Sequence, residues 1–548
     1  MKRVLMVSFQ FPPMAGSSGV QRALRFAQQL PAEGWEPSVL TAHPRVHEQT
    51  GEDLMAEVPP GLRVRRAFAL DAARHLSVRR RYPGALARPD RWTSWLLGAI
   101  PTGLAMIRAT RPDVIWSTYP IPSAHLVGYW LSRLSGLPWV ADFRDPMAHD
   151  GYPADPVLWR SFAAVERRVF SRARRFTFTT PGAARLYAGR FPAAADRLRV
   201  IENGYSEEAF LQAERLVAAP HAPHAPLTLL HSGIVYPDWR SPVHLFRALS
   251  AAKSQGWIDA SRLRLQFRAP SHAGFVEGLA RQNDIAELVE VLPPLPYAQA
   301  LAEMLQADAL LLLQSNDCND QIPAKAYEYL RARRPILTLA DPQGDTAHLM
   351  RRAGLPHQAA LEDGAGVDRV LRRFLSELQG GVASLPNEAA IAAASRRART
   401  TELARVLDEV LDERAPLTGS ATRGPRTAPS TSSAAEAERP ARAVVPAAPV
   451  PSAASASASA SASASASAPV PVPVLAPAVS LAMASPVIST VASPVASPLA
   501  PSAAASAADA SAASAAAVSA AAATAAASPA VSPASLHAAT SAASKARP

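Results

Sequence analysis

The strongest constraint on the fold is a regular alternation of short, mostly apolar runs with longer amphipathic segments. In the first part of the chain, the runs cover residues 3–8, 36–41, 112–118, 138–143, 175–180 and 199–204. Each run predicts a β-strand, since it has the length and apolar content of a buried strand. The segment after the first run places Val20, Leu24 and Ala27 on one face of a helix. Strands that alternate with such helices predict a parallel sheet covered on both faces.

The alternation breaks once and then resumes. Residues 207–226 are rich in Ala, Pro and His and predict an interdomain linker. Beyond them, strand patterns recur at residues 227–233, 262–267, 287–292, 308–314 and 335–339. The sequence therefore predicts an α/β protein with two doubly wound Rossmann-like domains. We expect these domains to cover residues 1–206 and 227–385, and a helical segment at 386–414 to pack back across both.

The composition changes sharply near the end of the chain. From about Ala415 onward it is dominated by Ala, Ser, Pro and Val, and the last aromatic residue of the whole chain is Phe374. A segment without aromatic anchors cannot bury enough apolar surface to offset the conformational entropy that ordering removes. We therefore expect residues 415–548 to form a disordered tail, which leaves a folded part long enough for two domains.

The charge of the chain argues against one class of partner. The net charge is +11, and the seven Lys/Arg and three Asp/Glu beyond Glu413 account for +4 of it. The remaining +7 is a mild excess compared with the dense basic stripe of nucleic-acid-binding proteins, so we expect no nucleic-acid partner. A single cysteine, Cys318, excludes an intrachain disulfide and is typical of a reducing cytoplasm.

One region combines arginines with an apolar run. The arginines that precede the run are Arg74, Arg79, Arg80, Arg81, Arg88 and Arg91. The run itself, Trp95–Ile107, is too short to span a bilayer. It forms either a core helix or part of an Arg- and Trp-rich patch, within residues 74–107, that rests on an anionic membrane surface. Because the chain begins directly with a strand pattern and shows no cleavable signal, we expect a cytoplasmic protein, peripheral at most on the inner face of the membrane.

Ligands of doubly wound sheets bind outside the carboxyl ends of the strands, so the loops that leave these ends are the first places to search. The loop after the first strand contains Gly16 and Gly19 and leads into a helix that begins near Val20. The glycines let the backbone approach a ligand closely, and the helix N-terminus favours an anion. The G-x-x-G spacing differs from the dinucleotide fingerprint, and a flexible turn is the alternative.

A second loop, ADFRDPM, brings Asp142, Arg144 and Asp145 out of a buried strand. Two carboxylates on either side of an arginine form either an internal ion-paired corner or a site that holds sugar hydroxyls beside a positive charge. The sequence alone leaves both interpretations open.

Two further loops lie in the second half of the chain. The first places Arg240 just before a helix, where a guanidinium is suited to a phosphate. The second is a polar loop that leads into the helix of Lys325 and Glu328, whose N-terminus is again a candidate phosphate site. These two side chains form either an ordinary i,i+3 ion pair or two separate contacts, in which Glu328 accepts hydrogen bonds from a ribose diol.

No metal site is predicted. The sequence contains no Cys/His spacing of a metal centre, and His221 and His224 fall in the predicted linker. The D-x-x-D pairs of the loops are more often simply solvated. There is also no G-x-S-x-G motif and no P-loop.

Taken in order, the four loops resemble the GT-B glycosyltransferases of the retaining family 4, also called glycosyl transferase group 1. The segment PPMAGSSGVQRALRFAQQLPAEGWEPSVLT resembles the glycine loop and first helix of that family. The segment PDVIWSTYPIPSAHLVGYWLSRLSGLPWVADFRDP resembles the part that ends in its D-F-R-D turn. In the second half, HSGIVYPDWRSP resembles the phosphate-facing loop, and IPAKAYEYLRARRPILTL resembles the donor-binding helix and strand.

The resemblance implies a hexosyltransferase for cell-surface polysaccharide synthesis that retains the anomeric configuration and needs neither metal nor cofactor. A nucleotide-diphosphate-sugar donor is expected on the second domain, and a glycan or lipid-linked acceptor on the first. By position, Glu328 would hold the donor ribose, and Arg240, supported by Lys325, would neutralise the leaving diphosphate. The Gly16–Gly19 loop would close on both substrates, and Asp145 would contact the reacting sugars, so Asp145 and Arg240 are the expected catalytic residues.

Two positions depart from the family pattern. Asp320 stands eight residues before Glu328, where the family usually has Glu, and Ile234 replaces the usual Arg after the loop glycine. Two other functions therefore stay open: a nucleotide-sugar epimerase on the same fold, and a catalytically inactive homologue that acts as a binding or scaffold subunit. The presence of Arg240 and Lys325 argues against the second of these.

Overall fold

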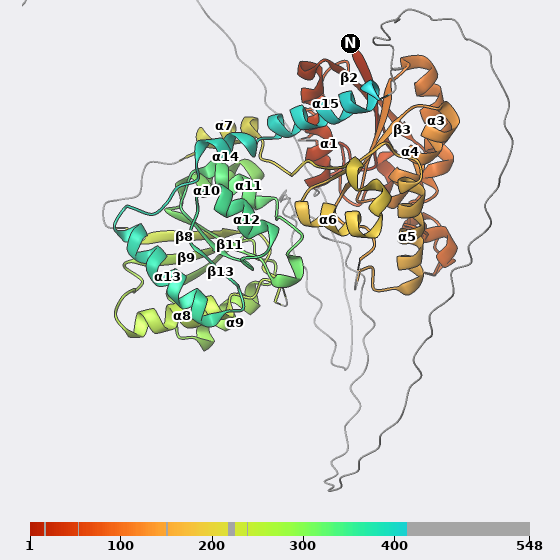
Figure 1. The fold of residues 1–548 in the computed structure, drawn as a ribbon. Coiled ribbons are helices and arrows are strands. Elements are labelled where there is room, and N and C mark those ends of the chain that lie inside the picture. Colours follow the sequence, from red (N-terminus) through yellow and green to blue (C-terminus); the bar gives the residue numbers. More distant parts are fainter. Residues whose placement is uncertain are drawn as a thin grey trace, which may run out of the picture. The chain divides into compact units, whose positions relative to one another are not determined.

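The computed structural model describes residues 1–413 apart from residues 16–17, 53, 80, 150–151, 218–224 and 238 (Figure 1). The tail that we predict to be disordered lies outside the described residues, as do Gly16 and Arg80.

The first domain contains a seven-stranded parallel sheet in the order β3-β2-β1-β4-β5-β6-β7. Its strands are β1 (Lys2–Ser8), β2 (Trp35–Ala42), β3 (Arg63–Ala67), β4 (Val114–Thr118), β5 (Trp139–Arg144), β6 (Arg175–Phe178) and β7 (Leu198–Val200). Its helices are α1 (Ser18–Gln29), α2 (Ala72–His75), α3 (Trp95–Thr110), α4 (Pro122–Ser135), α5 (Pro156–Phe170) and α6 (Pro181–Arg190). The chain reverses the direction in which strands are added between β1 and β4, and the loops that leave this point are therefore candidate ligand sites.

The second domain contains a six-stranded parallel sheet in the order β10-β9-β8-β11-β12-β13. Its strands are β8 (Leu227–Ser232), β9 (Leu263–Arg268), β10 (Val289–Leu292), β11 (Ala309–Leu313), β12 (Ile336–Leu339) and β13 (Gln358–Ala359). Its helices are α7 (Glu207–Glu214), α8 (Val243–Ser254), α9 (Ala273–Gln282), α10 (Tyr297–Gln306), α11 (Lys325–Ala332), α12 (Asp345–Arg352) and α13 (Gly364–Gln379). Here the corresponding point lies between β8 and β11.

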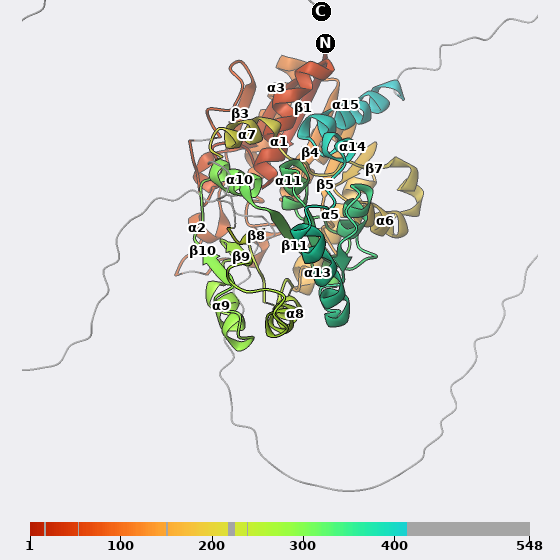
Figure 2. The same cartoon turned by 90° about the vertical axis from the view of Figure 1, so that its left-hand side faces the viewer.

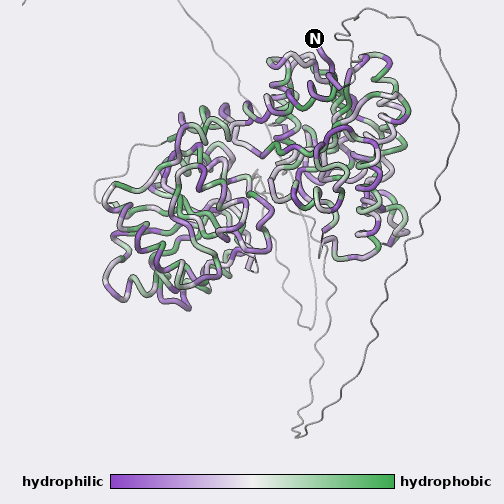
Figure 3. Tube along the Cα trace, viewed as in Figure 1, coloured by the Kyte–Doolittle hydropathy of each residue, from purple (hydrophilic) through white to green (hydrophobic). Residues whose placement is uncertain are grey.

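Each sheet is covered by apolar side chains on both faces, as the apolar strands require. In β1, Leu5 and Val7 belong to the core on one face, whereas Val4 and Met6 belong to the core on the other. This is the alternation of a strand that is buried on both sides. Figure 3 shows hydrophobic positions running through both sheets, with hydrophilic positions more frequent toward the outside. The architecture confirms the predicted class, two doubly wound Rossmann-like domains.

The last two helices, α14 (Glu388–Ala393) and α15 (Arg396–Asp412), pack on different domains. The helix α14 contacts α11 of the second domain, whereas α15 contacts α1 of the first (Figure 2). Leu403, Leu407 and Val410 of α15 share one core with Ala23 and Phe26 of α1.

One local prediction was wrong, and one strand was not predicted. The predicted linker is helical at its start, because α7 occupies Glu207–Glu214 and packs against α10. The strand β3 was not predicted, because its residues RVRRA lack a continuous apolar run. The run Trp95–Ile107 lies in α3, where the buried residues Trp95, Ala99 and Met106 recur at helical spacing, so one face of α3 belongs to the core.

Candidate functional site

Lys325, the first residue of α11, lies next to a glycine turn at the carboxyl ends of β8 and β11. The turn follows β8 at Gly233, whose φ of +103° is a conformation that other residues rarely adopt. A Cβ on Gly233 would lie 3.0 Å from Nζ of Lys325, and Nζ lies 3.3 Å from Nε2 of His231. Lys325 is only 7% exposed. The ammonium is therefore held inside the domain, at the sheet edge where ligands of this fold bind.

Arg240 lies at the same edge. Its Nε and Nη2 donate to Oε1 of Gln314 at 3.3 and 3.1 Å, and its guanidinium lies 5.6 Å from the centre of the Tyr236 ring. Burial lowers the pKa of Arg240 and, together with the nearby charge of Arg240, holds the pKa of Lys325 well below its usual value. In the part of the chain that the structure describes, neither cation has an ion pair with a carboxylate. Buried charges without such partners are costly, so this edge favours an anion.

Glu328 does not form the ion pair with Lys325 that its spacing allowed. Its Oε1 instead accepts a hydrogen bond of 2.8 Å from the hydroxyl of Tyr297 on α10. Burial raises the pKa of Glu328, and the Tyr297 hydrogen bond and the charges of Arg396 and Lys325 oppose this rise. The carboxylate is thus held in a fixed orientation, one turn along α11 from the lysine.

Three side chains at this edge were not predicted: His231, Gln314 and Tyr297. His231 and Gln314 are polar residues at the ends of otherwise apolar strands, and this was a usable signal for both. Nothing in the sequence distinguishes Tyr297 from other aromatic residues on amphipathic helices.

At the first sheet, Asp142 is the centre of a buried corner. Its carboxylate accepts hydrogen bonds from Nε and Nη2 of Arg22 at 3.1 and 2.9 Å, from Thr118 at 2.7 Å and from Thr177 at 2.6 Å. Burial raises the pKa of Asp142, but Arg22 and these hydroxyls outweigh it and lower the pKa overall. Asp142 therefore belongs to an internal ion-paired corner, but its partner is Arg22 of α1 and not the neighbouring Arg144.

Asp145 and Gly19 lie near this corner but face other groups. Asp145 is partly exposed, and its Oδ1 accepts a hydrogen bond of 3.2 Å from Thr179. A Cβ on Gly19 would overlap Oε1 of Gln10 and would lie 2.5 Å from Nη1 of Arg144, so a larger residue there would have to displace the ends of these two side chains. The described part of the glycine loop therefore packs directly against the D-F-R-D turn.

Asp320 approaches the first domain. A Cβ on Gly182, in the first turn of α6, would overlap Oδ1 of Asp320, whose main-chain oxygen accepts a hydrogen bond of 2.7 Å from Thr180. Asp345 lies beside it: its Oδ2 accepts a hydrogen bond of 2.6 Å from the main-chain N–H of Gly182, and its Oδ1 lies 3.3 Å from Nη2 of Arg185. Acidic groups at a helix N-terminus are favourable, so these contacts stabilise the approach of the two domains.

Two arginines of the cluster at residues 74–91, Arg74 and Arg91, form contacts inside the first domain. Arg91 pairs with Glu48 and with Asp71 and lies over the ring of Trp92 at 4.5 Å. Nη1 of Arg74 donates to the main-chain oxygen of His47 at 2.8 Å.

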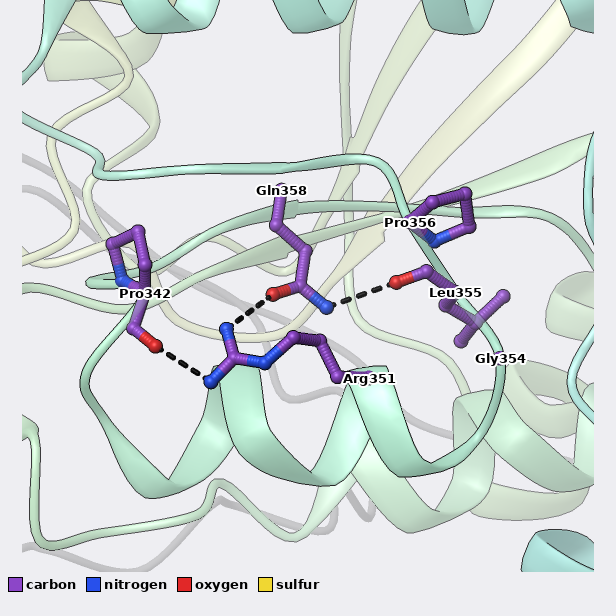
Figure 4. Close-up of a pocket in the computed structure, with 6 residues that line it drawn as sticks. All are labelled: Pro342, Arg351, Gly354, Leu355, Pro356 and Gln358. Carbon is purple, nitrogen blue, oxygen red and sulfur yellow. Dashed lines mark hydrogen bonds between the residues drawn. The ribbon is translucent and has the colours of Figure 1, made fainter.

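A surface cavity of about 620 Å³ lies at the far edge of the second domain (Figure 4). It is lined by Pro342, Arg351, Gly354, Leu355, Pro356 and Gln358. Arg351 donates to the main-chain oxygen of Pro342 at 2.7 Å and to Oε1 of Gln358 at 3.2 Å, and Gln358 donates to Leu355 at 2.9 Å. These polar groups satisfy one another, and none of the predicted site residues lines the cavity. Across the described residues, moreover, no group of three or more His, Cys, Asp or Glu side chains could hold a metal ion.

Comparison with known proteins bears on the first domain and on the fold. Residues 18–204 match the family model of the glycosyl transferase 4-like domain. No curated protein matches the chain.

Several solved structures share the fold. Sucrose-phosphate synthase from Thermosynechococcus elongatus aligns with a TM-score of 0.51 and 14% identity, over 75% of this chain and 100% of its own. A glycosyltransferase from Rickettsia africae aligns with a TM-score of 0.52 and 12% identity, over 75% of this chain and 98% of its own. HepE from Anabaena, solved with UDP, aligns with a TM-score of 0.50 and 13% identity, over 75% of this chain and 100% of its own. At these identities the likeness shows the fold, which is the predicted GT-B architecture.

Proposed function

We propose that this GT-B chain, whose residues 18–204 match the glycosyl transferase 4-like domain, transfers a sugar from a nucleotide-diphosphate-sugar to a glycan or lipid-linked acceptor. The observation that carries the proposal is the pair of cations at the carboxyl edge of the second sheet, the buried Lys325 and the partly buried Arg240. Neither is ion-paired with a carboxylate of the described residues, and a diphosphate would supply the missing negative charge.

Departure of the diphosphate is the step that these cations would assist. Breaking the bond between the anomeric carbon and the leaving oxygen places the electron pair on the diphosphate, and its negative charge increases. Fixed cations and the N-terminus of α11 stabilise that charge more strongly in the transition state than in the bound donor. We infer that this arrangement makes a metal ion unnecessary, and that no cofactor takes part besides the donor itself.

Glu328 would hold the ribose of the donor. Because the Tyr297 hydroxyl occupies Oε1, the second oxygen of the carboxylate is the one proposed to accept a ribose hydroxyl. A carboxylate held in this way loses little conformational freedom on binding, which favours affinity.

On the facing side, Asp145 would contact the reacting sugars. It is partly exposed at the end of β5 and is oriented by Thr179, and the glycine loop at Gly19 lies close to the same turn. Retention of the anomeric configuration, transfer of a hexose and a role in cell-surface polysaccharide synthesis are proposed from the family resemblance.

The acceptor side suggests a lipid surface as the place of action. The helices α3 and α4 pack together and contain no Asp or Glu, while Leu97 of α3 and Leu134 of α4 are 77% and 56% exposed. Arg108 and Arg133 lie on the same helices. Exposed leucines and arginines on two packed helices without acidic residues suit an anionic bilayer, and we propose peripheral contact of a cytoplasmic protein with the inner face of the membrane. No helix in the described ranges is long and apolar enough to cross a membrane.

Vesicle sedimentation tests the membrane contact. The protein should sediment with vesicles that contain phosphatidylglycerol and stay in solution with phosphatidylcholine alone. Leu97→Asp together with Leu134→Asp should abolish sedimentation, whereas Val382→Asp, at an exposed apolar residue of the second domain, should not. Equal sedimentation of all variants would exclude membrane contact through Leu97 and Leu134.

A donor screen tests the transfer. The protein should show a raised melting temperature with one class of nucleoside diphosphate or nucleotide sugar, because ligands that bind the folded state stabilise it. Labelled sugar should then appear in a lipid extract, and Glu328→Ala should weaken donor binding. Formation of a free 2-epimer without an acceptor would identify an epimerase instead, and the absence of any donor binding would leave a scaffold role.

A further inference from the structure

His231 occupies a defined tautomer. It lies near the end of β8, fully buried, with Nδ1 at 2.9 Å from the main-chain oxygen of Leu311 in β11. A carbonyl oxygen only accepts hydrogen bonds, so Nδ1 carries the hydrogen. Nε2 therefore presents a lone pair, and Nζ of Lys325 lies 3.3 Å from it. The main chain of Ile234 also lies close to the imidazole ring. The lysine donates and the histidine accepts.

The charged groups around this pair are few. Arg240 approaches from the loop that precedes α8, and Glu328 lies one turn along α11 from Lys325 and is engaged by Tyr297. Burial and the charges of Lys325 and Arg240 hold the pKa of His231 well below its usual value, so the imidazole is neutral near pH 7. A neutral acceptor fixes the position of the lysine and leaves its charge uncancelled.

We propose that His231 is a positioning residue that holds Lys325 through a neutral hydrogen bond, so that the charge of this lysine is satisfied only when the donor diphosphate binds. The inference rests on the proposed function, because it assigns the diphosphate to this edge of the sheet. The proposal also explains why residue 231, beside Lys325, is a histidine and not a carboxylate. A carboxylate would hold the lysine equally well, but it would neutralise the charge that the diphosphate needs.

Two variants of His231 separate position from charge. His231→Gln keeps a neutral acceptor at the end of a side chain of similar reach, whereas His231→Glu places a carboxylate beside Lys325. The control is His357→Gln, which alters another buried histidine of the same domain, outside the proposed site. Calorimetry with UDP, GDP, ADP and inorganic pyrophosphate measures binding, and thermal melts report whether each variant is folded.

The expected pattern is specific to charge. His231→Glu should keep or raise the melting temperature without ligand but weaken binding of the diphosphate by about 10- to 100-fold, as expected when a charge-assisted hydrogen bond is lost. His231→Gln should stay within about threefold of the wild type, below the loss of one net hydrogen bond. Wild-type affinity in the Glu variant, or an equal loss in both variants, would overturn the proposal.

A measurement on the unaltered protein covers the case in which the variants do not fold. A bound diphosphate should raise the lowered pKa of Lys325 toward its usual value. In buffers of different ionisation enthalpy, at a series of pH values up to 10.5, binding should therefore be accompanied by proton uptake at the pH where free Lys325 loses its proton. Lys325→Met should abolish the uptake. Binding without proton uptake in the wild type would contradict the proposal, whereas the absence of any diphosphate binding would contradict the proposed function itself.

Discussion

At the scale of single residues, Asp142 and Asp145 show how different two carboxylates of one turn can be. Asp142 is fully buried and paired with Arg22, whereas Asp145 is partly exposed and accepts a hydrogen bond from Thr179. The first carboxylate supports the turn, and the second is the one proposed to contact the reacting sugars.

Replacing these two residues should separate stability from activity. Asp142→Asn leaves the buried charge of Arg22 without its partner and should lower the free energy of unfolding by about 3–5 kcal/mol. Asp145→Asn should cost less stability than Asp142→Asn, because the carboxylate of Asp145 is partly exposed, although its charge also acts on the buried Arg144. Sugar transfer should fall. Urea unfolding and transfer assays measure the two effects, and a large stability loss in Asp145→Asn would contradict this assignment.

Lys325 should also give the free protein a distinctive pH dependence. Its pKa in the folded state is well below 10.5, its value without burial, so the unfolded chain binds more protons between these two pKa values. Stability must therefore rise with pH through this window, as the folded protein is relieved of a buried charge. Melting curves across the window should show the rise in the wild type and a smaller one in Lys325→Met. A stability that falls there in both proteins would exclude a buried, unneutralised lysine.

The candidate site could be predicted only in part. The spacing of Lys325 and Glu328 at a helix start suggested two contacts, and the structure excludes the ion pair between them. By contrast, Asp142 and Asp145 are equivalent in the sequence, because nothing local shows that Arg22 reaches the first of them. The contribution of His231 depends on Leu311 and Lys325, which are distant in the sequence, so no local pattern could reveal it.

At the scale of elements, helix α15 is the clearest case of an element that stabilises a domain to which it is not adjacent in sequence. Its residues Leu403, Leu407 and Val410 are buried against α1, and Asp408 accepts a hydrogen bond from the indole of Trp35 at 3.1 Å. The first domain therefore depends on a helix that follows the second in the chain.

Leu407→Ala should test this dependence. Removing a fully buried side chain from this core should cost about 2–5 kcal/mol of stability. Arg405→Ala, at an exposed position of the same helix, should cost less than about 0.5 kcal/mol. Urea unfolding followed by the fluorescence of the first-domain tryptophans measures both. An equal effect of the two substitutions would mean that α15 is held by its helix propensity alone.

Strands that are buried on both faces were easier to predict from the sequence than strands at the edge of a sheet. The strands β1 and β11 carry continuous apolar runs because both of their faces are covered, and the sequence located them. The edge strand β3 has three arginines among its five residues and was missed, since a strand covered less completely needs fewer apolar residues. The helix α7 was missed because the Ala, Pro and His that follow it dominated the composition of the segment.

At the scale of the whole molecule, several contacts between the domains lie at the N-terminus of α6, and another joins Arg352 to Glu202. Asp345 accepts the N–H of Gly182, and Asp320 lies beside it. These carboxylates belong to the domain proposed to bind the donor, so their position is coupled to the loop that precedes Lys325.

Removing one of these charges should loosen the domains relative to each other. Asp345→Asn weakens a buried, charge-assisted hydrogen bond and should reduce stability by about 1.5–3 kcal/mol, with faster hydrogen exchange at the start of α6. Asp368→Asn, in a partly exposed pair with Arg372 on α13, is the matched control and should change stability by less than about 1 kcal/mol. Unchanged exchange at α6 in Asp345→Asn would show that this contact does not hold the domains.

The packing of α15 on α1 also has a consequence for synthesis on the ribosome. The chain emerges from its N-terminus, so the strands of the first domain are complete long before Leu403 and Leu407 leave the exit tunnel. Until then the surface of α1 that these leucines cover is exposed to the cell. The second domain is made during this interval, and its folding rate sets how long a nascent first domain with an open apolar face must avoid aggregation.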